Sequence, residues 1–292
     1  MRAALSRLVK IQSTFLSKQT PQRLVYTSSA TMTKLSLNST LRMPSGYEIP
    51  ILGYGVYQTP ANIAAEVVEH AIKVGGYRHV DSAVAYRNEA PSSEGMKKSG
   101  IPREQLFFTT KIPPKDMSYE NAKKHVQNSL RETGFDYIDL YLLHAPYGGK
   151  ENRIGAWKAL VEGVEAGVIR SIGVSNYGVY HLDELETYIK STDEKEGQGK
   201  GGVLSVNQVE LHPWLARKDI VDWCNERGVV LEAYCPIVRA TKTNDPLLTS
   251  LAKKHNKTTS QILLRWSLQM VSISPYYLFP KSYDPQGFRA PP

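Results

Sequence analysis

Polar residues follow short apolar runs at nearly constant intervals along most of this 292-residue chain. The residues that end these runs are Asp81, Lys111, His144, Asn176, Gln208, Tyr234 and Lys281. The intervals between them are 30, 33, 32, 32, 26 and 47 residues. An interval of about 30 residues accommodates a strand, a returning helix and two loops, which is one parallel βαβ step. The pattern therefore predicts an α/β fold with a parallel sheet built from repeated units.

The length of the repeating part decides which parallel fold is expected. A (β/α)₈ TIM barrel takes about 250 residues, and residues 48–292 supply 245. The first strand is expected at 49–57, and helices are expected at 61–74, 88–99, 118–132, 153–165, 179–190, 217–226, 246–255 and 258–270. A polar, glycine-rich stretch at 191–202 is expected to be a solvated loop. Because barrel strands direct their C-terminal ends to one mouth, the polar residues should meet there.

The net charge of +8 does not indicate a nucleic-acid-binding surface. Residues 1–47 contain seven basic and no acidic residues, which leaves 29 basic and 28 acidic residues in the rest of the chain. A nucleic-acid-binding domain would cluster its basic residues on the folded part. Since no run of 18 apolar residues occurs, no membrane span is expected. We expect a small-molecule partner, with no nucleic acid and no membrane.

The N-terminal segment, taken as residues 1–40 ahead of a barrel at 41–292, is basic, free of acids and rich in Ser and Thr. That composition is typical of a mitochondrial presequence. The alternatives are a disordered basic tail or a translation start at Met32, so the expected location is mitochondrial or cytoplasmic.

Cys224 and Cys235 form neither a disulfide framework nor a zinc-binding spacing, which fits a reducing compartment and no metal site.

Several motifs in the chain are specific to one family. VDSA at 80–83 is followed by Tyr86 and by Asn88-Glu89, and then come GVSN at 173–176, NQVELHP at 207–213 and PKS at 280–282. With these motifs in this order, the chain resembles the aldo-keto reductases, of the aldose- and xylose-reductase-like type. The resemblance runs from about Tyr47 to Trp266. It implies an NAD(P)H-dependent barrel enzyme, acting on CH–OH donors and binding NADPH, that reduces aldehydes or ketones to alcohols. The acid–base tetrad that it implies is Asp81, Tyr86, Lys111 and His144.

The tetrad residues suit carbonyl reduction, which needs a hydride at the carbon and a proton at the oxygen. A tyrosine hydroxyl, with an ordinary pKa of about 10, is a weak acid at neutral pH. We expect the ammonium group of Lys111 to lower the pKa of Tyr86, and Asp81 to hold Lys111 in place. His144 is expected to donate a hydrogen bond to the carbonyl oxygen, or to relay the proton at lower pH.

The same resemblance implies the cofactor contacts. Ser175, Asn176 and Gln208 would bind the nicotinamide carboxamide, and Tyr234 would stack on the nicotinamide ring. Lys281 and Ser282 would bind the 2′-phosphate that distinguishes NADPH from NADH.

The substrate pocket is expected to include Tyr57 and His144, with Trp214 and Tyr147 as candidate walls. Many relatives carry bulky aromatic residues just after the tetrad lysine and histidine, whereas this chain has Ile-Pro at 112–113 and Ala-Pro at 145–146. The substrate preference of those relatives is therefore not carried over.

The resemblance weakens over the last 22 residues. Relatives carry an arginine one turn after the lysine of PKS, and then an eighth helix. In residues 283–292 the single arginine is Arg289, and three prolines leave no room for a helix. We expect an incomplete eighth βα unit, as in a shortened or alternatively spliced product, and weaker NADPH binding.

A monomeric reductase is the main hypothesis. The alternatives are a catalytically silent NADPH-binding barrel that serves as a regulatory subunit, and a sugar-phosphate isomerase, which the lack of a glycine-rich loop after Tyr234 disfavours.

Overall fold

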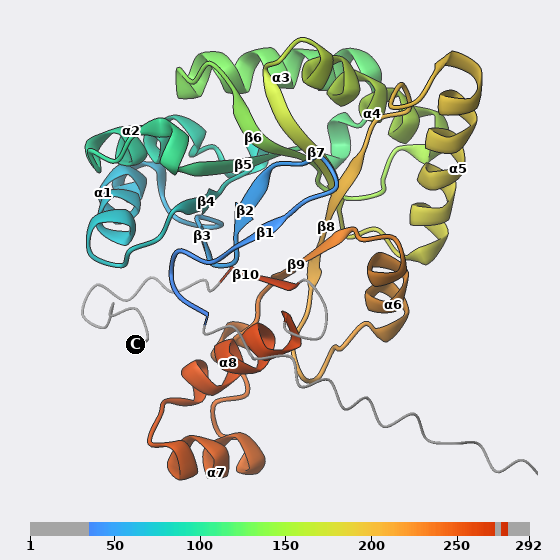
Figure 1. Ribbon diagram of the computed structural model, residues 1–292. Helices are drawn as coiled ribbons and strands as arrows, with labels where there is room; N and C mark the ends of the chain where they lie inside the picture. Colours follow the sequence, from blue (N-terminus) through green and yellow to red (C-terminus); the bar gives the residue numbers. More distant parts are fainter. Residues whose placement is uncertain (1–34, 272–275, 280–292) are drawn as a thin grey trace, which may run out of the picture. The chain divides into compact units, whose positions relative to one another are not determined.

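Eight parallel strands follow one another in chain order around a curled sheet in the computed structural model, which describes residues 35–271 and 276–279 (Figure 1). The strands are β3 (Gly53–Gly55), β4 (His79–Asp81), β5 (Phe107–Ile112), β6 (Ile138–Leu143), β7 (Ile169–Ser175), β8 (Leu204–Glu210), β9 (Val230–Tyr234) and β10 (Tyr276–Phe279). Each strand pairs with the next, and β10 also lies close to β3. The predicted fold class, a (β/α)₈ barrel, is therefore confirmed.

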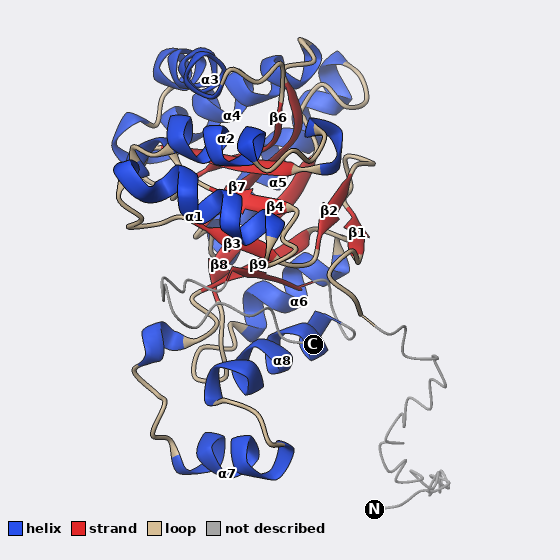
Figure 2. Ribbon diagram, turned by 90° about the vertical axis from the view of Figure 1, so that its left-hand side faces the viewer, coloured by secondary structure: helices blue, strands red, loops and turns tan. Residues whose placement is uncertain are grey.

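The helices lie outside the strands (Figure 2). They are α1 (Ala61–Lys73), α2 (Glu89–Lys98), α3 (Tyr119–Thr133), α4 (Gly149–Glu165), α5 (Val179–Glu196), α6 (Lys218–Glu226), α7 (Pro246–His255) and α8 (Thr259–Val271). Short 3₁₀ turns occur at Val84–Tyr86, Arg103–Gln105, Pro114–Asp116 and Val238–Ala240. Two helices, α7 and α8, lie between β9 and β10 and account for the long final interval. No helix in the described ranges is long and apolar enough to cross a membrane.

Two helix starts follow directly from local sequence. The Ser118 side chain accepts a hydrogen bond from the Asn121 amide at the start of α3. At α7, Asp245 accepts from the Leu248 amide at 3.0 Å, and Pro246 occupies the first helical position. Each cap satisfies an amide that has no partner within its own helix.

The strand expected at 49–57 is divided between two sheets. β1 (Thr40–Arg42) and β2 (Glu48–Pro50) form an antiparallel hairpin, and β3 begins the barrel only at Gly53. Met43 and Ile49 of the hairpin region are buried with Phe107, Leu140, Leu142, Val206 and Val230. The hairpin therefore contacts the interior of the barrel near the N-terminal ends of its strands, opposite the mouth.

The barrel strands are buried on both faces, as expected for a parallel sheet covered by helices. On β5, alternate residues face opposite sides: Phe108 packs in the large cluster between sheet and helices, whereas Phe107 belongs to the inner cluster. Thr109 and Lys111 share the inward face with Phe107. This alternation brings a lysine into the barrel interior.

The stretch at 191–202 is not a solvated loop throughout, contrary to expectation. α5 continues to Glu196, and Thr192 on it is buried. The Gly201 carbonyl accepts a hydrogen bond from the Trp157 indole at 2.8 Å. A Cβ at Gly202 would lie 2.5 Å from Val161 Cγ2. Gly202 is therefore a packing position against α4, and a Cβ at Gly201 would lie 2.4 Å from the Ile189 carbonyl oxygen of α5.

We predict that Gly173→Ala destabilises the barrel. A Cβ at Gly173 would lie 2.5 Å from the Val206 carbonyl oxygen and 2.8 Å from Leu142 Cδ2, so the inner layer must shift. Such overpacking costs about 1–3 kcal/mol. The free energy of unfolding, from urea titrations followed by circular dichroism, measures the loss. The matched control is Gly178→Ala, where nothing lies within 4 Å of the added carbon. An equal loss in both variants would contradict the prediction.

Candidate active site

The residues predicted from strand ends meet at the C-terminal end of the sheet. Asp81 ends β4, Lys111 is next to last in β5, and His144 follows β6 directly. Ser175 ends β7, and Tyr234 ends β9. Since these strands are parallel neighbours, their ends lie side by side (Figure 1).

A buried ion pair lies at the centre of this site. Lys111 Nζ donates to both carboxylate oxygens of Asp81 at 2.6 Å and to the Ser82 carbonyl at 2.7 Å. The Lys111 side chain is fully buried and that of Asp81 is 7% exposed. Three acceptors match the three N–H groups of the ammonium. Burial raises the pKa of Asp81, while the hydrogen bonds from Lys111 and Gln208 act in the opposite direction.

Tyr86 and His144 lie above this pair. The Tyr86 hydroxyl is 3.5 Å from His144 Nε2, and the two rings meet edge to face. Lys111 Nζ lies 5.2 Å from the centre of the Tyr86 ring. The structure thus brings together all four residues of the expected tetrad.

The pKa of Tyr86 is raised in this structure, whereas a lowered pKa was expected from the neighbouring Lys111. Burial raises the pKa of Tyr86, and the negative charge of Asp81 acts in the same direction. Burial also lowers the pKa of His144 to about 3, with a contribution from the Lys111 charge. His144 is therefore neutral at neutral pH.

Asn88 holds the Tyr86 loop in place. Its carboxamide nitrogen donates to the Val56 carbonyl at 2.9 Å and the Thr59 carbonyl at 3.1 Å, and its oxygen accepts from the Ser82 hydroxyl at 2.9 Å. Asn88 is fully buried. Sequence reasoning included Asn88 only as part of a motif, because its partners are carbonyl groups that no side-chain pattern reveals.

Ser175, Asn176 and Tyr234 form a second polar group at the mouth. Asn176 donates from its amide nitrogen to the His144 carbonyl at 3.0 Å and to Ser175 Oγ at 3.1 Å. Its amide oxygen accepts from the Tyr234 hydroxyl at 2.8 Å. Ser175 Oγ donates to the backbone carbonyl of Gln208 at 2.9 Å. Asn176 adopts a left-handed conformation (φ 62°), which asparagine tolerates better than most residues.

Gln208 connects this group to the ion pair. Its Nε2 donates to Asp81 Oδ2 at 2.9 Å and to Glu232 Oε2 at 2.8 Å. The Asp81 carboxylate can accept only from the NH₂ end, so this contact fixes the orientation of the Gln208 carboxamide. Its carbonyl oxygen is left as an acceptor, which suits an amide donor such as a nicotinamide carboxamide.

Sequence reasoning missed Glu232. Its carboxyl group is fully buried in β9, and burial raises its pKa to about 8, with a smaller contribution from the Asp81 charge. In the sequence, Glu232 is recognisable as a glutamate inside an apolar strand. It stands two residues before Tyr234 and is therefore on the same face of β9.

The expected pocket residues are exposed to different degrees. Tyr57 is 43% exposed, and the centroid of its ring lies 5.0 Å from that of the Tyr86 ring. Trp214 is 40% exposed and lies near His212, and Tyr147 is 64% exposed. Lys281 and Ser282 lie outside the described residues. Within the described ranges, no group of three or more His, Cys, Asp or Glu side chains is arranged to hold a metal ion.

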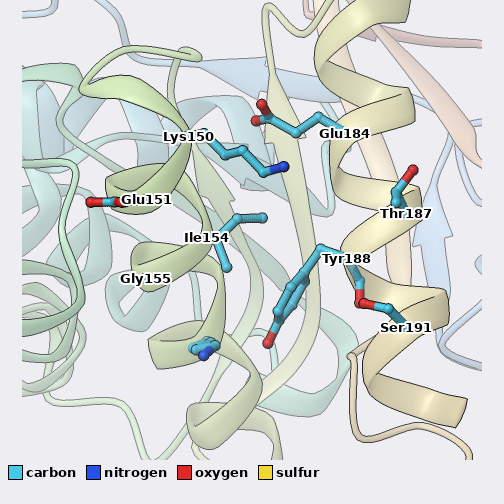
Figure 3. Close-up of a pocket in the computed structure, with 9 residues that line it drawn as sticks. Lys150, Glu151, Ile154, Gly155, Glu184, Thr187, Tyr188 and Ser191 are labelled. Carbon is cyan, nitrogen blue, oxygen red and sulfur yellow. The ribbon is translucent and has the colours of Figure 1, made fainter. Parts of the chain in front are cut away.

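A groove of about 410 Å³ lies between α4 and α5 (Figure 3). Its lining residues are Lys150, Glu151, Ile154, Gly155, Lys158, Glu184, Thr187, Tyr188 and Ser191. None of the tetrad residues lines it, so it is separate from the mouth of the barrel.

Comparison with known proteins agrees with this geometry. The model of the "Aldo/keto reductase family" matches residues 52–280. A glyoxal reductase of Bacillus subtilis is 41% identical over 235 residues, covering 80% of each chain. An aldo-keto reductase of Mycolicibacterium smegmatis is 37% identical over 246 residues, covering 84% of each. The crystal structure of an aldo/keto reductase from Brucella melitensis superposes with a TM-score of 0.74 at 36% identity, covering 84% of this chain and 88% of that one. The chain therefore belongs to the aldo/keto reductase family and is an NAD(P)H-dependent oxidoreductase.

Proposed function

We propose that this protein, acting as a monomer, uses NADPH to reduce small aldehydes or ketones to alcohols, with Tyr86 as the proton donor. The observation that carries the proposal is the contact of Tyr86 OH with His144 Nε2 above the buried Lys111–Asp81 pair. The glyoxal reductase among its relatives supports small aldehydes as the substrate class. A bound reduced nicotinamide supplies the hydride.

Tyr86 suits the proton-donating role despite its raised pKa. The raised pKa keeps the hydroxyl protonated at neutral pH, so the proton is present when it is needed. As hydride adds to the carbonyl carbon, the C=O π bond breaks and the oxygen becomes an alkoxide. An alkoxide is a stronger base than a phenolate, so transfer of the Tyr86 proton to it is favourable. Solvent then returns a proton to the phenolate.

His144 and Lys111 support this transfer in different ways. Neutral His144 can donate one N–H to the carbonyl oxygen and hold it beside Tyr86, which polarises the carbonyl. Lys111 Nζ lies 5.2 Å from the centre of the Tyr86 ring, so its positive charge stabilises the phenolate that forms. Asp81 keeps Lys111 oriented through two hydrogen bonds.

The cofactor proposal rests on the second polar group together with the family. Gln208 offers a carbonyl oxygen, and Tyr234 offers a partly exposed ring at the end of β9. Asn176 already accepts from Tyr234 and donates to His144, so binding of a nicotinamide carboxamide by Asn176 requires it to exchange the Tyr234 hydroxyl for the ligand. Lys281 and Ser282 remain assigned to the 2′-phosphate by the sequence motif alone.

We predict that Tyr86→Phe abolishes turnover and leaves cofactor binding nearly unchanged, because only the proton donor is removed. NADPH oxidation at 340 nm, with a panel of glyoxal-type aldehydes, ketones and aldoses, measures turnover. Quenching of tryptophan fluorescence measures binding. The matched control is Tyr180→Phe, which removes a hydroxyl from an exposed tyrosine on α5. If Tyr86→Phe retained most of the turnover, the proton-donor assignment would fail. If the wild-type protein bound NADPH but reduced no carbonyl compound, the result would favour the alternative of a catalytically silent barrel that serves as a regulatory subunit.

We further predict that Lys281→Met weakens NADPH binding about tenfold or more and changes NADH binding little. A charge-assisted hydrogen bond contributes roughly 1.5–3 kcal/mol, and only NADPH carries the 2′-phosphate. Fluorescence titration of both cofactors measures the two dissociation constants. Lys190→Met, which removes a lysine from α5, should leave both unchanged. Equal weakening of NADPH and NADH would exclude the phosphate role.

We also propose that the basic segment at 1–40 directs the protein to mitochondria. A fluorescent reporter fused after residue 34 should enter mitochondria of eukaryotic cells, whereas a chain that starts at Met32 should stay cytosolic. Replacing Arg7 and Lys10 by Glu should abolish import, because the basic face of the segment is lost. A full-length fusion that remained cytosolic and unprocessed would support the cytoplasmic alternative.

A further inference from the structure

Glu232 is a carboxyl group buried beneath the candidate nicotinamide site. It is fully buried on β9, between Leu231 and Ala233. One oxygen, Oε2, accepts from Gln208 Nε2 at 2.8 Å. The other, Oε1, has no hydrogen-bond partner among the described residues and lies 4.0 Å from His79 Nε2. A buried carboxyl group with an unused oxygen is costly, so its presence here calls for a physical reason.

The position of Glu232 relates it to the cofactor proposal. Residues two apart on a strand face the same side, so Glu232 lies one layer below Tyr234, the residue proposed to stack on the nicotinamide. Gln208, proposed to bind the nicotinamide carboxamide, is held from below by two carboxyl groups, those of Asp81 and Glu232. Glu232 therefore acts on the cofactor site through Gln208 and through its charge.

Few described groups can compensate that charge. His79 and Asp81 face Glu232 from β4, Lys111 from β5 and Gln208 from β8. Burial lowers the pKa of His79 to about 3, so this histidine is neutral. The Lys111 ammonium is already paired with Asp81. The cluster is thus neutral overall when Glu232 is protonated and carries one negative charge when Glu232 is ionised.

We propose that Glu232 is a positioning residue that fixes Gln208 and, by gaining or losing a proton, sets the relative affinity of the site for oxidised and reduced cofactor. This inference rests on the proposed binding of a nicotinamide cofactor at Tyr234 and Gln208. An oxidised nicotinamide ring carries a positive charge and a reduced ring carries none. Ionised Glu232 therefore stabilises the oxidised form selectively, because charges in a low-dielectric interior interact strongly.

The sign of the pH dependence follows from linkage. The oxidised cofactor favours ionised Glu232, so its binding lowers the pKa of this residue from about 8 and releases a proton. Affinity for the oxidised cofactor then rises with pH until the pH exceeds about 8, by at most tenfold per pH unit for one proton. Affinity for the reduced cofactor should change much less over the same range.

The experiment measures the ratio of the dissociation constants for NADP⁺ and NADPH between pH 6.5 and 9. Both carry the same 2′-phosphate, so titration of that group cancels in the ratio. We expect the wild-type ratio to fall at least threefold in favour of NADP⁺ as pH rises, and the ratio of Glu232→Gln to stay constant. Calorimetry at pH 7.5 in two buffers of different ionisation enthalpy counts the proton released by the wild-type protein, so this arm needs no variant to fold.

Two control variants separate Glu232 from other acids. Glu89 is also a buried glutamate whose pKa burial raises, but it bonds Thr110 and faces α3, away from Gln208. Glu89→Gln should keep the wild-type pH dependence. Cys235→Ser removes the thiol that lies near Tyr86 and Tyr234 and should also keep it.

The outcomes are distinguishable. A pH-independent ratio in the wild-type protein, an unchanged dependence in Glu232→Gln, or its loss in Cys235→Ser would each overturn the role of Glu232 while leaving carbonyl reduction by Tyr86 intact. If neither NADP⁺ nor NADPH bound to the wild-type protein, the proposed function would fail and this inference with it. A dependence present in the wild type and both controls and absent from Glu232→Gln would support the proposal.

Discussion

The site depends on one interaction, the buried pair between Lys111 and Asp81. Removing an ammonium and a carboxylate from water costs several kcal/mol per ion, which only close contact and further hydrogen bonds offset. The structure provides both, with contacts of 2.6 Å to Asp81, a third bond to the Ser82 carbonyl and a donor from Gln208. Because these partners come from β4, β5 and β8, the pair also ties three strands to one geometry at the mouth.

The location of this pair was predictable from sequence because strand ends can be recognised. Each βα unit has a similar length, so the polar residue after each apolar run appears at a regular interval and must reach the same end of a parallel sheet. This reasoning located Asp81, Lys111 and His144 without any contact information. Tyr86 lies on a loop outside the periodic pattern, and only the family motif identified it.

Other features were not predictable, since they depend on what packs against a residue. The end of α5 and the glycines at 201 and 202 look like a solvated loop in sequence, yet Trp157 binds the Gly201 carbonyl. The direction of the pKa shift of Tyr86 required knowing that the hydroxyl is buried and lies near the charge of Asp81. Glu232 is one acidic residue in an apolar strand. Its proposed role depends on a hydrogen bond from Gln208, 24 residues earlier in the chain.

The barrel interior changes in character along its axis. Near the hairpin it contains Met43, Ile49 and Leu140, where apolar packing closes the barrel. At the mouth it contains Lys111, Asp81 and Gln208, whose side chains are held in place by hydrogen bonds to one another. Glu232 is the register partner of Gln208 on the neighbouring strand, and it is both fully buried and held by the Gln208 side chain. Because burial raises the pKa of this carboxyl group to about 8, both of its protonation states are populated near neutral pH, which is not so for an ordinary solvated glutamate.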